Sequence, residues 1–414
     1  MEGYSLQFRH IELQGALMAL LGGTFEESAN SILFRNALNY TGAADMGVAD
    51  IASYNQAMQY VTVSDHVPRE ALVEAIERCS LAHALYEVMA EGNTYTDVVA
   101  LVSSNGSFDD LKRGQVNENT TWCVRARHYG EISGSVKEKR YGAHARSMSL
   151  EREVLQALKP IMLQFGGKVD LEQPGCKIYA FDGLESTSPK VLARQIASGR
   201  RVSGIAPNTR ICVTNTPLCP IASFSLCNVA GVRPGHTILD PYAGSCAIFL
   251  AAAMIAPTCR TVGIEISHNG LVNRDDIRKD FSSRQLVEPL ALLQGDSTDE
   301  GLRATARAVI GDEPFDLIIT DPPYGIRESN NYNEMAPIDE LLQSIQRDRA
   351  AGKRLLKKGG RLVCFIPVQE EETLEDAMPT PAQLEQAGLR CEVVREQPLN
   401  DKLRRWLVSF QCVA

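Results

Sequence analysis

Five short apolar runs, separated by segments with helical character, dominate the second half of the chain. The intervening segments include AIFLAAAMIA and IDELLQSIQRDRAAGKRLLKK. Near-continuous apolar strands that alternate with helices predict an α/β fold with a doubly wound, mostly parallel sheet covered on both faces. Two further runs, RCEVVREQPL and RRWLVSFQCV, follow each other closely and predict a terminal antiparallel hairpin. The five runs are HTILDPYAG, RTVGIEIS, EPLALLQGD, FDLIITDPP and GRLVCFIPV.

The first half of the chain has a different, mixed α+β pattern. We expect strands at 4–10, 31–38 and 58–64, and helices at 11–23 and 68–80. Farther on, we expect a strand, then a loop rich in Gly, Ser and Lys, and then a helix. A basic stretch follows, KVLARQIASGRRVSGIAPNTR, which we interpret as a linker or hinge into the last domain. These patterns predict three domains, at 1–75, 76–205 and 212–414.

Composition narrows the class of protein. The 414 residues are 44% hydrophobic and 22% charged, which is ordinary for a globular protein. No apolar run approaches the roughly 18 residues of a membrane span, and GALMALLGG is too short and lacks the basic lead of a signal peptide. Eleven cysteines without a C-x-x-C pair predict no metal site built by this chain alone. Scattered thiols fit a reducing compartment, so we expect a cytoplasmic protein.

Charge is distributed unevenly. Residues 1–120 carry 6 basic and 16 acidic side chains, whereas residues 121–210 carry 15 basic and 8 acidic ones. An acidic protein with one basic middle segment can bind nucleic acid, because the local field sets contact with phosphates. A solvated basic face is the alternative. The candidate RNA-binding residues are Arg125, Arg127, Lys137, Lys139, Arg140, Arg200 and Arg201.

Acidic residues follow the first three apolar runs of the predicted parallel sheet. Asp240 and Gly244 follow the first run, Glu265 the second and Asp296 the third. Ligands of such sheets bind beyond the carboxyl ends of the strands. The chain lacks both G-x-x-x-x-G-K-[ST] and G-x-G-x-x-G, which disfavours nucleoside triphosphates and dinucleotides. The pattern has one glycine and two acids that can accept hydrogen bonds from a ribose and an adenine. This suits S-adenosylmethionine, which contains both groups but no phosphate.

The fourth run ends in the motif Asp321-Pro322-Pro323-Tyr324. Two prolines stiffen the turn and lack N–H groups. Asp321, ordinarily ionised at neutral pH, and the Pro322 carbonyl can accept the two protons of a nucleobase amine, which leaves its lone pair facing a methyl donor. Tyr324 can stack on the base. The motif therefore predicts transfer of a methyl group to an exocyclic amine, and a strand-terminating turn with an exposed tyrosine is the alternative.

The motifs TDPPYGIRE and ILDPYAGSCAIFLAAA resemble those of amino-methyltransferases, and in particular the catalytic subunits of tRNA (guanosine-10-N2)-methyltransferases. SLAHALYEVMAEGNTYTDVV and TNTPLCPIASFSLCNVAGVRPG are similar to upstream parts of that family. The resemblance implies a ferredoxin-like domain, a THUMP RNA-binding domain and a class I (Rossmann-like) methyltransferase domain. It also implies S-adenosylmethionine as donor, tRNA as substrate and a small zinc-binding activator protein as partner.

The resemblance also implies roles for individual residues. Asp321, Pro322 and Tyr324 would hold and activate the guanine. The cofactor would be held by Thr216, Asp240, Gly244, Glu265 and Asp296.

The chain departs from the family pattern at two positions. Cys246 stands where glycine is common, and Glu265 where aspartate is common. Two other functions remain open from the sequence: methylation of an amine on another base or nucleic acid, and RNA binding without catalysis.

Overall fold

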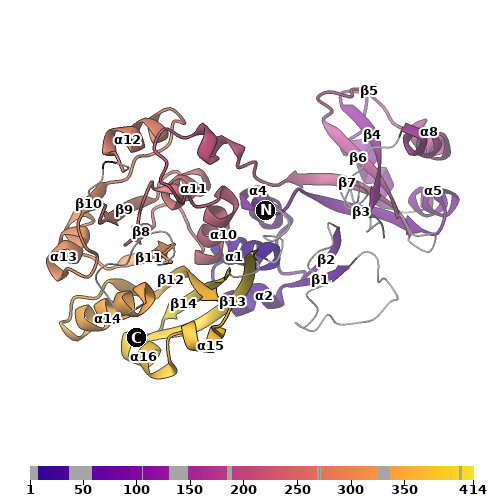
Figure 1. The fold of residues 1–414 in the computed structure, drawn as a ribbon. Helices are drawn as coiled ribbons and strands as arrows, with labels where there is room; N and C mark the ends of the chain where they lie inside the picture. Colours follow the sequence, from indigo (N-terminus) through magenta and orange to yellow (C-terminus); the bar gives the residue numbers. More distant parts are fainter. Residues whose placement is uncertain are drawn as a thin grey trace. The chain divides into compact units, whose positions relative to one another are not determined.

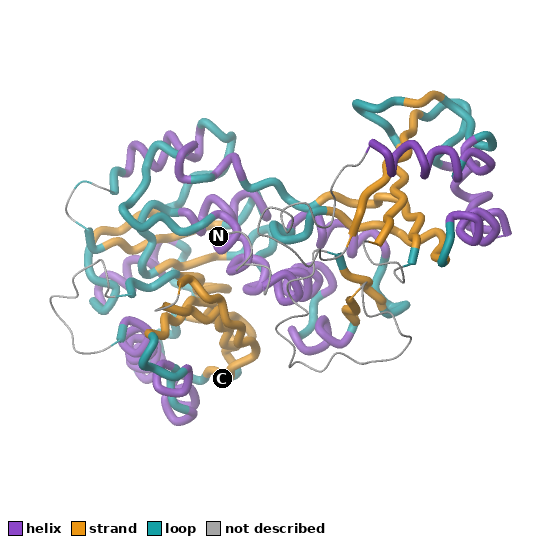
Figure 2. The backbone as a smooth tube through the Cα atoms, turned by 45° about the vertical axis from the view of Figure 1, so that its right-hand side comes forward, coloured by secondary structure: helices purple, strands orange, loops and turns teal. Residues whose placement is uncertain are grey.

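The computed structural model describes residues 8–36, 58–104, 106–129, 148–183, 189–267, 270, 272–324, 336–400 and 403–414. The chain forms two compact units, each assembled from separate segments (Figure 1). Unit 1 comprises residues 1–31, 67–82 and 199–414, and unit 2 comprises residues 32–66 and 83–198. Figure 2 traces the backbone and shows that both units mix helices and strands. No helix among the described residues is long and apolar enough to cross a membrane.

A seven-stranded sheet, in the order β10-β9-β8-β11-β12-β14-β13, is the centre of unit 1. The first five strands in this order run parallel, and β14 is antiparallel to both β12 and β13. The doubly wound methyltransferase-like sheet and the terminal hairpin are therefore confirmed. The strands are β8 (Thr237–Asp240), β9 (Arg260–Glu265), β10 (Ala291–Gln294), β11 (Phe315–Thr320), β12 (Leu356–Gln369), β13 (Leu389–Asn400) and β14 (Leu403–Cys412).

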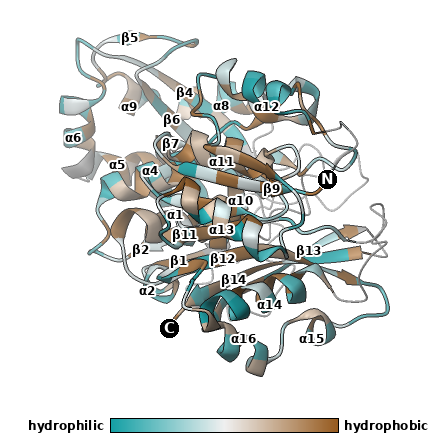
Figure 3. Ribbon diagram, turned by 90° about the vertical axis from the view of Figure 1, so that its left-hand side faces the viewer, coloured by the Kyte–Doolittle hydropathy of each residue, from teal (hydrophilic) through white to brown (hydrophobic). Residues whose placement is uncertain are grey.

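Helices cover both faces of this sheet, because successive strand residues point to opposite sides. Ile238 and Leu317 pack into one core, whereas their neighbours Leu239 and Ile318 pack into the other. Figure 3 shows apolar residues along these strands and polar residues on outer helix surfaces. The first core includes residues of α10 (Pro220–Ala230), α11 (Ala247–Ile255) and α12 (Arg274–Ser282), and the second includes residues of α13 (Glu300–Val309), α14 (Pro337–Ala350) and α16 (Pro381–Ala387).

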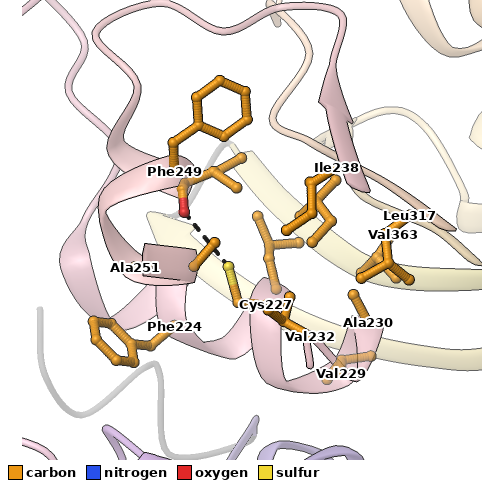
Figure 4. Close-up of a cluster of buried hydrophobic side chains, with 14 of the residues drawn as sticks. Phe224, Cys227, Val229, Ala230, Val232, Ile238, Phe249, Ala251, Leu317 and Val363 are labelled. Atoms are coloured by element: carbon orange, nitrogen blue, oxygen red, sulfur yellow. Dashed lines mark hydrogen bonds between the residues drawn. The ribbon is translucent and has the colours of Figure 1, made fainter. Parts of the chain in front are cut away.

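The first core includes Ala243 and Cys246 of the loop that follows β8. Figure 4 shows Ala230 of α10 on the side of the cluster where Leu317 and Val363 of the sheet lie, and Phe224 of the same helix on the opposite side. The Cys227 thiol lies 3.6 Å from the carbonyl oxygen of Ile248 in α11. This packing fixes α10 and α11 against the strands whose carboxyl ends carry the predicted site residues.

The amino-terminal helix α1 (Arg9–Leu21) belongs to unit 1 and not to a domain of its own. At Gly15 its backbone lies so close to α10 that an added Cβ would be 2.3 Å from the Asn228 carbonyl oxygen. The buried Glu12 carboxylate accepts hydrogen bonds from the Ser80 and Leu81 N–H groups at 2.9 Å and from the Asn228 amide at 3.2 Å. Two further helices of unit 1 are α2 (Phe25–Asn30) and α4 (Arg69–Arg78).

The two units therefore do not follow the predicted boundaries of 1–75 and 76–205, because residues 1–31 and 67–82 belong to unit 1 whereas residues 32–66 between them belong to unit 2. The expected strand at 4–10 is also wrong where the structure describes it: Arg9 and His10 begin α1, and residues 4–7 lie outside the described residues. The other expected elements of the first 80 residues are present as α1, α4, β1 (Ile32–Asn36) and β2 (Gln59–Val63).

Unit 2 contains a five-stranded sheet in the order β3-β7-β6-β4-β5 and the separate hairpin β1-β2. One sheet face packs into a core with residues of α5 (Tyr95–Ser104), α6 (Gly106–Gly114), α8 (Met148–Ala157) and α9 (Lys159–Met162). The stretch interpreted as a linker begins with strand β7 (Lys190–Ser198), whose Val191 and Leu192 are buried, so that part of the interpretation is wrong. The other strands are β3 (Ala84–Gly92), β4 (Thr121–Tyr129), β5 (Lys168–Val169) and β6 (Cys176–Gly183).

Candidate functional site

Asp240 ends β8 and lies almost completely buried between two strand ends. Its Oδ1 accepts a hydrogen bond from the Thr320 hydroxyl at 2.6 Å and from the Tyr242 N–H at 3.0 Å. Thr320 is the last residue of β11, directly before the D-P-P-Y motif. Asp240 therefore links the loop after β8 to the start of the motif.

Burial raises the pKa of Asp240 to about 7, and the charges of Asp321 and Glu265 add to the effect. The hydrogen bonds from Thr320 and Tyr242 favour the ionised carboxylate and partly offset the rise. A cationic group bound nearby would lower this pKa. A bound cation would thus favour the ionised form of this carboxylate.

Two residues of the loop after β8 have left-handed backbone conformations. Gly244 has φ of +48°, and an added Cβ would meet only the Thr214 methyl group, at 4.0 Å. The glycine thus allows the turn and leaves room beside it, as expected for a loop that a ligand approaches closely. Thr216, which the resemblance places among the cofactor contacts, is exposed, and Thr214 is the threonine next to Gly244.

Cys246 is the second left-handed residue, with φ of +61°, and it precedes α11. Its side chain is completely buried. Burial raises the pKa of its thiol well above the ordinary value, so the thiol is protonated and packs as a small apolar group. The position therefore has the backbone conformation that favours glycine, which explains why glycine suits it in the related sequences.

Glu265 braces two loops at the end of β9. Its Oε2 accepts from the Gly244 N–H at 2.8 Å, and its Oε1 accepts from the Ser267 N–H at 2.8 Å. Each carboxylate oxygen has a second lone pair, so these bonds leave acceptor capacity for a diol. The glutamate side chain is long enough to reach both N–H groups. Glutamate in place of the aspartate common in the family therefore still provides an acidic hydrogen-bond acceptor.

Asp296 lies exposed in the loop after β10, and its Oδ1 accepts from the N–H and the hydroxyl of Thr298, both at 2.8 Å. A buried ion pair that the sequence did not reveal anchors this loop. Arg303 bonds to both oxygens of Asp348 on α14, at 2.8 and 2.9 Å, and donates to the Ser297 carbonyl at 3.0 Å. The loop is therefore fixed to the helix that follows the motif.

The D-P-P-Y motif follows β11, with Pro322 buried and Asp321 and Tyr324 half-buried. The Tyr324 hydroxyl donates to Asp321 Oδ1 at 2.7 Å. Arg405 of β14 donates from Nη1 to the same hydroxyl oxygen at 3.2 Å. Burial raises the pKa of Tyr324 far above its ordinary value, so the phenol remains protonated. Stacking of Tyr324 on a base stays a prediction.

The structure brings the predicted residues together in two groups. Glu265 is hydrogen-bonded to Gly244 and acts on the nearby Asp240 through its charge, and Asp321 is hydrogen-bonded to Tyr324. The two adjoin, because β8 and β11 are neighbouring parallel strands and Asp321 acts on Asp240 electrostatically. Thr320, Arg303 and Arg405 were missed. Of these three, only Arg405 could have been found from the sequence. It is an arginine at a position where the alternation of the strand predicts a buried side chain.

The candidate RNA-binding residues divide between the two units. In unit 2, Arg125 donates to the Leu171 carbonyl, and Arg127 forms an ion pair with Glu151 at 3.4 Å and lies over the Tyr179 ring. In unit 1, Arg200 donates to the Glu77 carbonyl, and Arg201 is exposed. Lys137, Lys139 and Arg140 lie outside the described residues. RNA binding by this set stays a prediction.

Comparison with known proteins shows that parts of the chain are similar to methyltransferases. Residues 207–300 match the family described as RMKL-like, methyltransferase domain (UPF0020). The chain is 27% identical over 307 residues to the tRNA (guanine(10)-N(2))-methyltransferase TRMT11 of Xenopus laevis, covering 64% of this chain and 61% of that protein. It is 27% identical over 247 residues to the tRNA (guanine(10)-N2)-dimethyltransferase of Methanothermobacter thermautotrophicus, covering 59% and 65%.

The chain thus matches somewhat less than two thirds of the length of these relatives. Among solved structures, TrmN from Thermus thermophilus is 20% identical, with a TM-score of 0.40 over 86% of this chain and 89% of that one. The sequence matches confirm the resemblance to the tRNA (guanosine-10-N2)-methyltransferases that the motifs predicted.

Proposed function

We propose that this chain is the catalytic subunit of an S-adenosylmethionine-dependent methyltransferase that acts on N2 of a guanosine in tRNA, at position 10. One observation supports this proposal most strongly. Carboxylates that can hold a cofactor lie at the ends of β8 and β9, next to the D-P-P-Y turn after β11, which can hold an amine. The names of the curated relatives support the choice of guanine and tRNA.

The cofactor would lie along the loops after β8, β9 and β10. Asp240 would attract its ammonium group, Gly244 would leave room for it, and Glu265 would accept from its ribose. Asp296, in the loop after β10, would accept from its adenine. When bound, S-adenosylmethionine supplies a methyl group attached to a positively charged sulfur. The open space beside Gly244 and the half-buried Glu265 carboxylate support this arrangement.

The residues of the motif would position the guanine. Asp321 and the Pro322 carbonyl would accept hydrogen bonds from the exocyclic amine, which directs the nitrogen lone pair towards the methyl donor. Asp321 would also take the proton that the amine loses. A guanosine in a helical stem has to be flipped out of the stack to reach this pocket, and Tyr324 would then stack on it.

The remaining parts of the proposal concern tRNA and a partner. Unit 2 would act as a THUMP-type domain that binds tRNA by shape and phosphates, with Arg125 among its contacts. A small zinc-binding activator protein would complete the enzyme in the cytoplasm. β10 is an edge strand of the sheet, and the exposed Val287 and Leu290 beside it offer such a partner a place to pair.

The test is transfer of labelled methyl groups to unmodified tRNA with the activator present, followed by nucleoside analysis. The proposal predicts N2-methylguanosine in the product. Methyladenosine or methylcytosine would support an amino-methyltransferase for another base. RNA binding without cofactor binding, measured by calorimetry, would support the catalytically inert alternative.

A further inference from the structure

Arg405 is a charged residue buried at the catalytic end of the sheet. Only 6% of its surface is exposed. An ionised group is rarely buried unless it is paired and hydrogen-bonded, because leaving water costs several kcal/mol. The surroundings of this guanidinium therefore need an explanation.

Three side chains from three different segments hold the guanidinium. Gln397, directly opposite on β13, accepts from Nε at 2.7 Å. The guanidinium carbon lies 3.9 Å from the centre of the Phe365 ring on β12, which is a cation–π contact. The third contact is with Tyr324 of the motif, at 3.2 Å. An amide, an aromatic ring and a phenol thus fix the side chain without neutralising its charge.

The balancing charge lies beyond the phenol. Burial lowers the pKa of Arg405, but the interactions with Tyr324 and Asp321 outweigh this effect, so its pKa is raised. The three groups form a line in which Arg405 donates to the Tyr324 oxygen and the Tyr324 hydroxyl donates to Asp321. The cation therefore compensates a carboxylate that it does not touch.

The direction of these hydrogen bonds is fixed by chemistry. A guanidinium has only donors, so the Tyr324 oxygen must accept from Arg405. The phenol proton then points to Asp321, and its bond at 2.7 Å fixes the plane of that carboxylate. Because an amine must meet Asp321 in one orientation, a small rotation of this plane would lower the rate.

We infer that Arg405 is a positioning residue for methyl transfer, which acts through the Tyr324 hydroxyl to fix Asp321 in the orientation that receives the substrate amine. This inference rests on the proposed function. Arg405 lies 81 residues from Tyr324 along the chain, in the terminal hairpin, and that hairpin is therefore part of the catalytic machinery. The residue does not contact substrate in this account.

The experiment is a double-mutant cycle with Arg405→Met and Tyr324→Phe. Methyl transfer to tRNA is measured as kcat and KM, and cofactor affinity is measured by calorimetry. We expect Arg405→Met alone to lower kcat roughly 30- to 100-fold, with KM and cofactor affinity changed less than about threefold. In the Tyr324→Phe background, the same substitution should lower kcat less than about threefold, because the hydroxyl through which Arg405 acts is gone.

Two further variants make the cycle decisive. Arg404→Met is the matched control, because Arg404 is the neighbour on β14, about two-fifths exposed, and is paired with Glu396 at 3.6 Å; it should leave kcat within about twofold. Arg405→Lys retains the charge and a donor, and it should recover at least about a third of the kcat lost in Arg405→Met. If Arg405→Met does not fold, Arg405→Lys replaces it in the double-mutant cycle.

The outcomes distinguish the role of Arg405 from the proposed function of the chain. Equal losses of kcat in both backgrounds, or a loss that follows cofactor affinity, would overturn the inference and leave the proposed function intact. A wild-type protein that binds cofactor but does not methylate tRNA would overturn the proposed function, and the inference with it.

Discussion

The loop after β8 contains residues of two kinds. Some have a role that the sequence predicts, and others have a conformation or a hydrogen bond that only the structure shows. Asp240 and Gly244 stand out because an acid and a glycine at a strand end are recognisable in any sequence. The left-handed conformation of Cys246 could not be predicted, since a cysteine gives no sign of positive φ. The Thr320–Asp240 bond was also hidden, because it joins residues 80 positions apart.

The conformation of Cys246 predicts an inversion of the usual order of stability. Elsewhere in a fold alanine is more favourable than glycine, but at φ of +61° alanine retains a strain of about 1–2 kcal/mol that glycine does not have. We expect Cys246→Gly to be more stable to urea than Cys246→Ala by about 1 kcal/mol. Equal stability, or a more stable alanine variant, would contradict the structure at this residue.

Asp240 predicts a dependence of stability on pH. Its pKa is about 7 in the folded chain and 3.8 in the unfolded one, so folding carries a cost that is absent below pH 4 and complete above pH 7. Asparagine can accept the same hydrogen bonds without the charge. We expect Asp240→Asn to raise the free energy of unfolding of the cofactor-free protein by about 1–3 kcal/mol more at pH 8 than at pH 5.

This difference is measured by urea denaturation of the cofactor-free protein at the two pH values, with the fluorescence of unit 1 as the signal. The same substitution should weaken cofactor binding, because the carboxylate is the group that would attract the ammonium. A stability difference that does not change with pH would show that Asp240 titrates as an ordinary surface carboxylate.

At the scale of elements, patterns predicted the sheet of unit 1 well and the junctions between elements less well. The strands from β8 to β14 follow the apolar runs because most of them contribute buried residues to the two cores, and the edge strand β10 contributes partly buried ones. β7 was missed as a strand because its apolar residues Val191, Leu192 and Ala193 are consecutive and not alternating, and charged residues flank them. Arg194, for example, bonds to Glu87 of β3.

Packing between elements makes Gly263 of β9 a test of the cofactor loop. An added Cβ would be 2.7 Å from the Ala243 Cβ and 2.7 Å from Leu292. We expect Gly263→Ala to displace the loop that contains Gly244 and to lower cofactor affinity at least about tenfold, with a loss of stability of about 1–3 kcal/mol. Calorimetric titration with S-adenosylmethionine is the measurement.

Gly204→Ala is the control, because an added Cβ there meets nothing within 4 Å and the backbone has no left-handed conformation. It should leave cofactor affinity unchanged. If the two alanine variants bind cofactor equally well, the loop after β8 does not depend on the close approach of β9.

At the scale of the whole molecule, the sequence predicted the methyltransferase-like unit but placed the amino-terminal helix outside it. A helix with buried Ile11, Leu13 and Leu17 needs a large core, and the sheet of unit 1 provides one through α10. Segment order along the chain was a poor guide, because unit 2 is inserted between parts of unit 1. Only contacts that are distant in sequence, such as Glu12 with Asn228, reveal this arrangement.

Gly15 tests whether α1 belongs to unit 1. An added Cβ would lie 2.3 Å from backbone of α10, so Gly15→Ala has to push the two helices apart. We expect faster hydrogen exchange in α1, α4 and α10, corresponding to a loss of about 2 kcal/mol or more of local stability, and unchanged exchange in β6. Gly114→Ala, where an added Cβ meets nothing within 4 Å, is the control in unit 2. Unchanged exchange in α10 would place α1 outside the unit.

In the proposed function, the carboxylate of Asp321 directs methyl transfer to N2 of guanosine in tRNA. The most direct test of this claim compares the wild-type chain with Asp321→Ala, each with the activator, by mass-spectrometric mapping of methylated nucleosides in tRNA. We expect N2-methylguanosine at position 10 with the wild type and at least about a 10³-fold lower rate with the variant, at unchanged cofactor affinity. Methylation that persists in Asp321→Ala, or that appears on a base other than guanine, would contradict it.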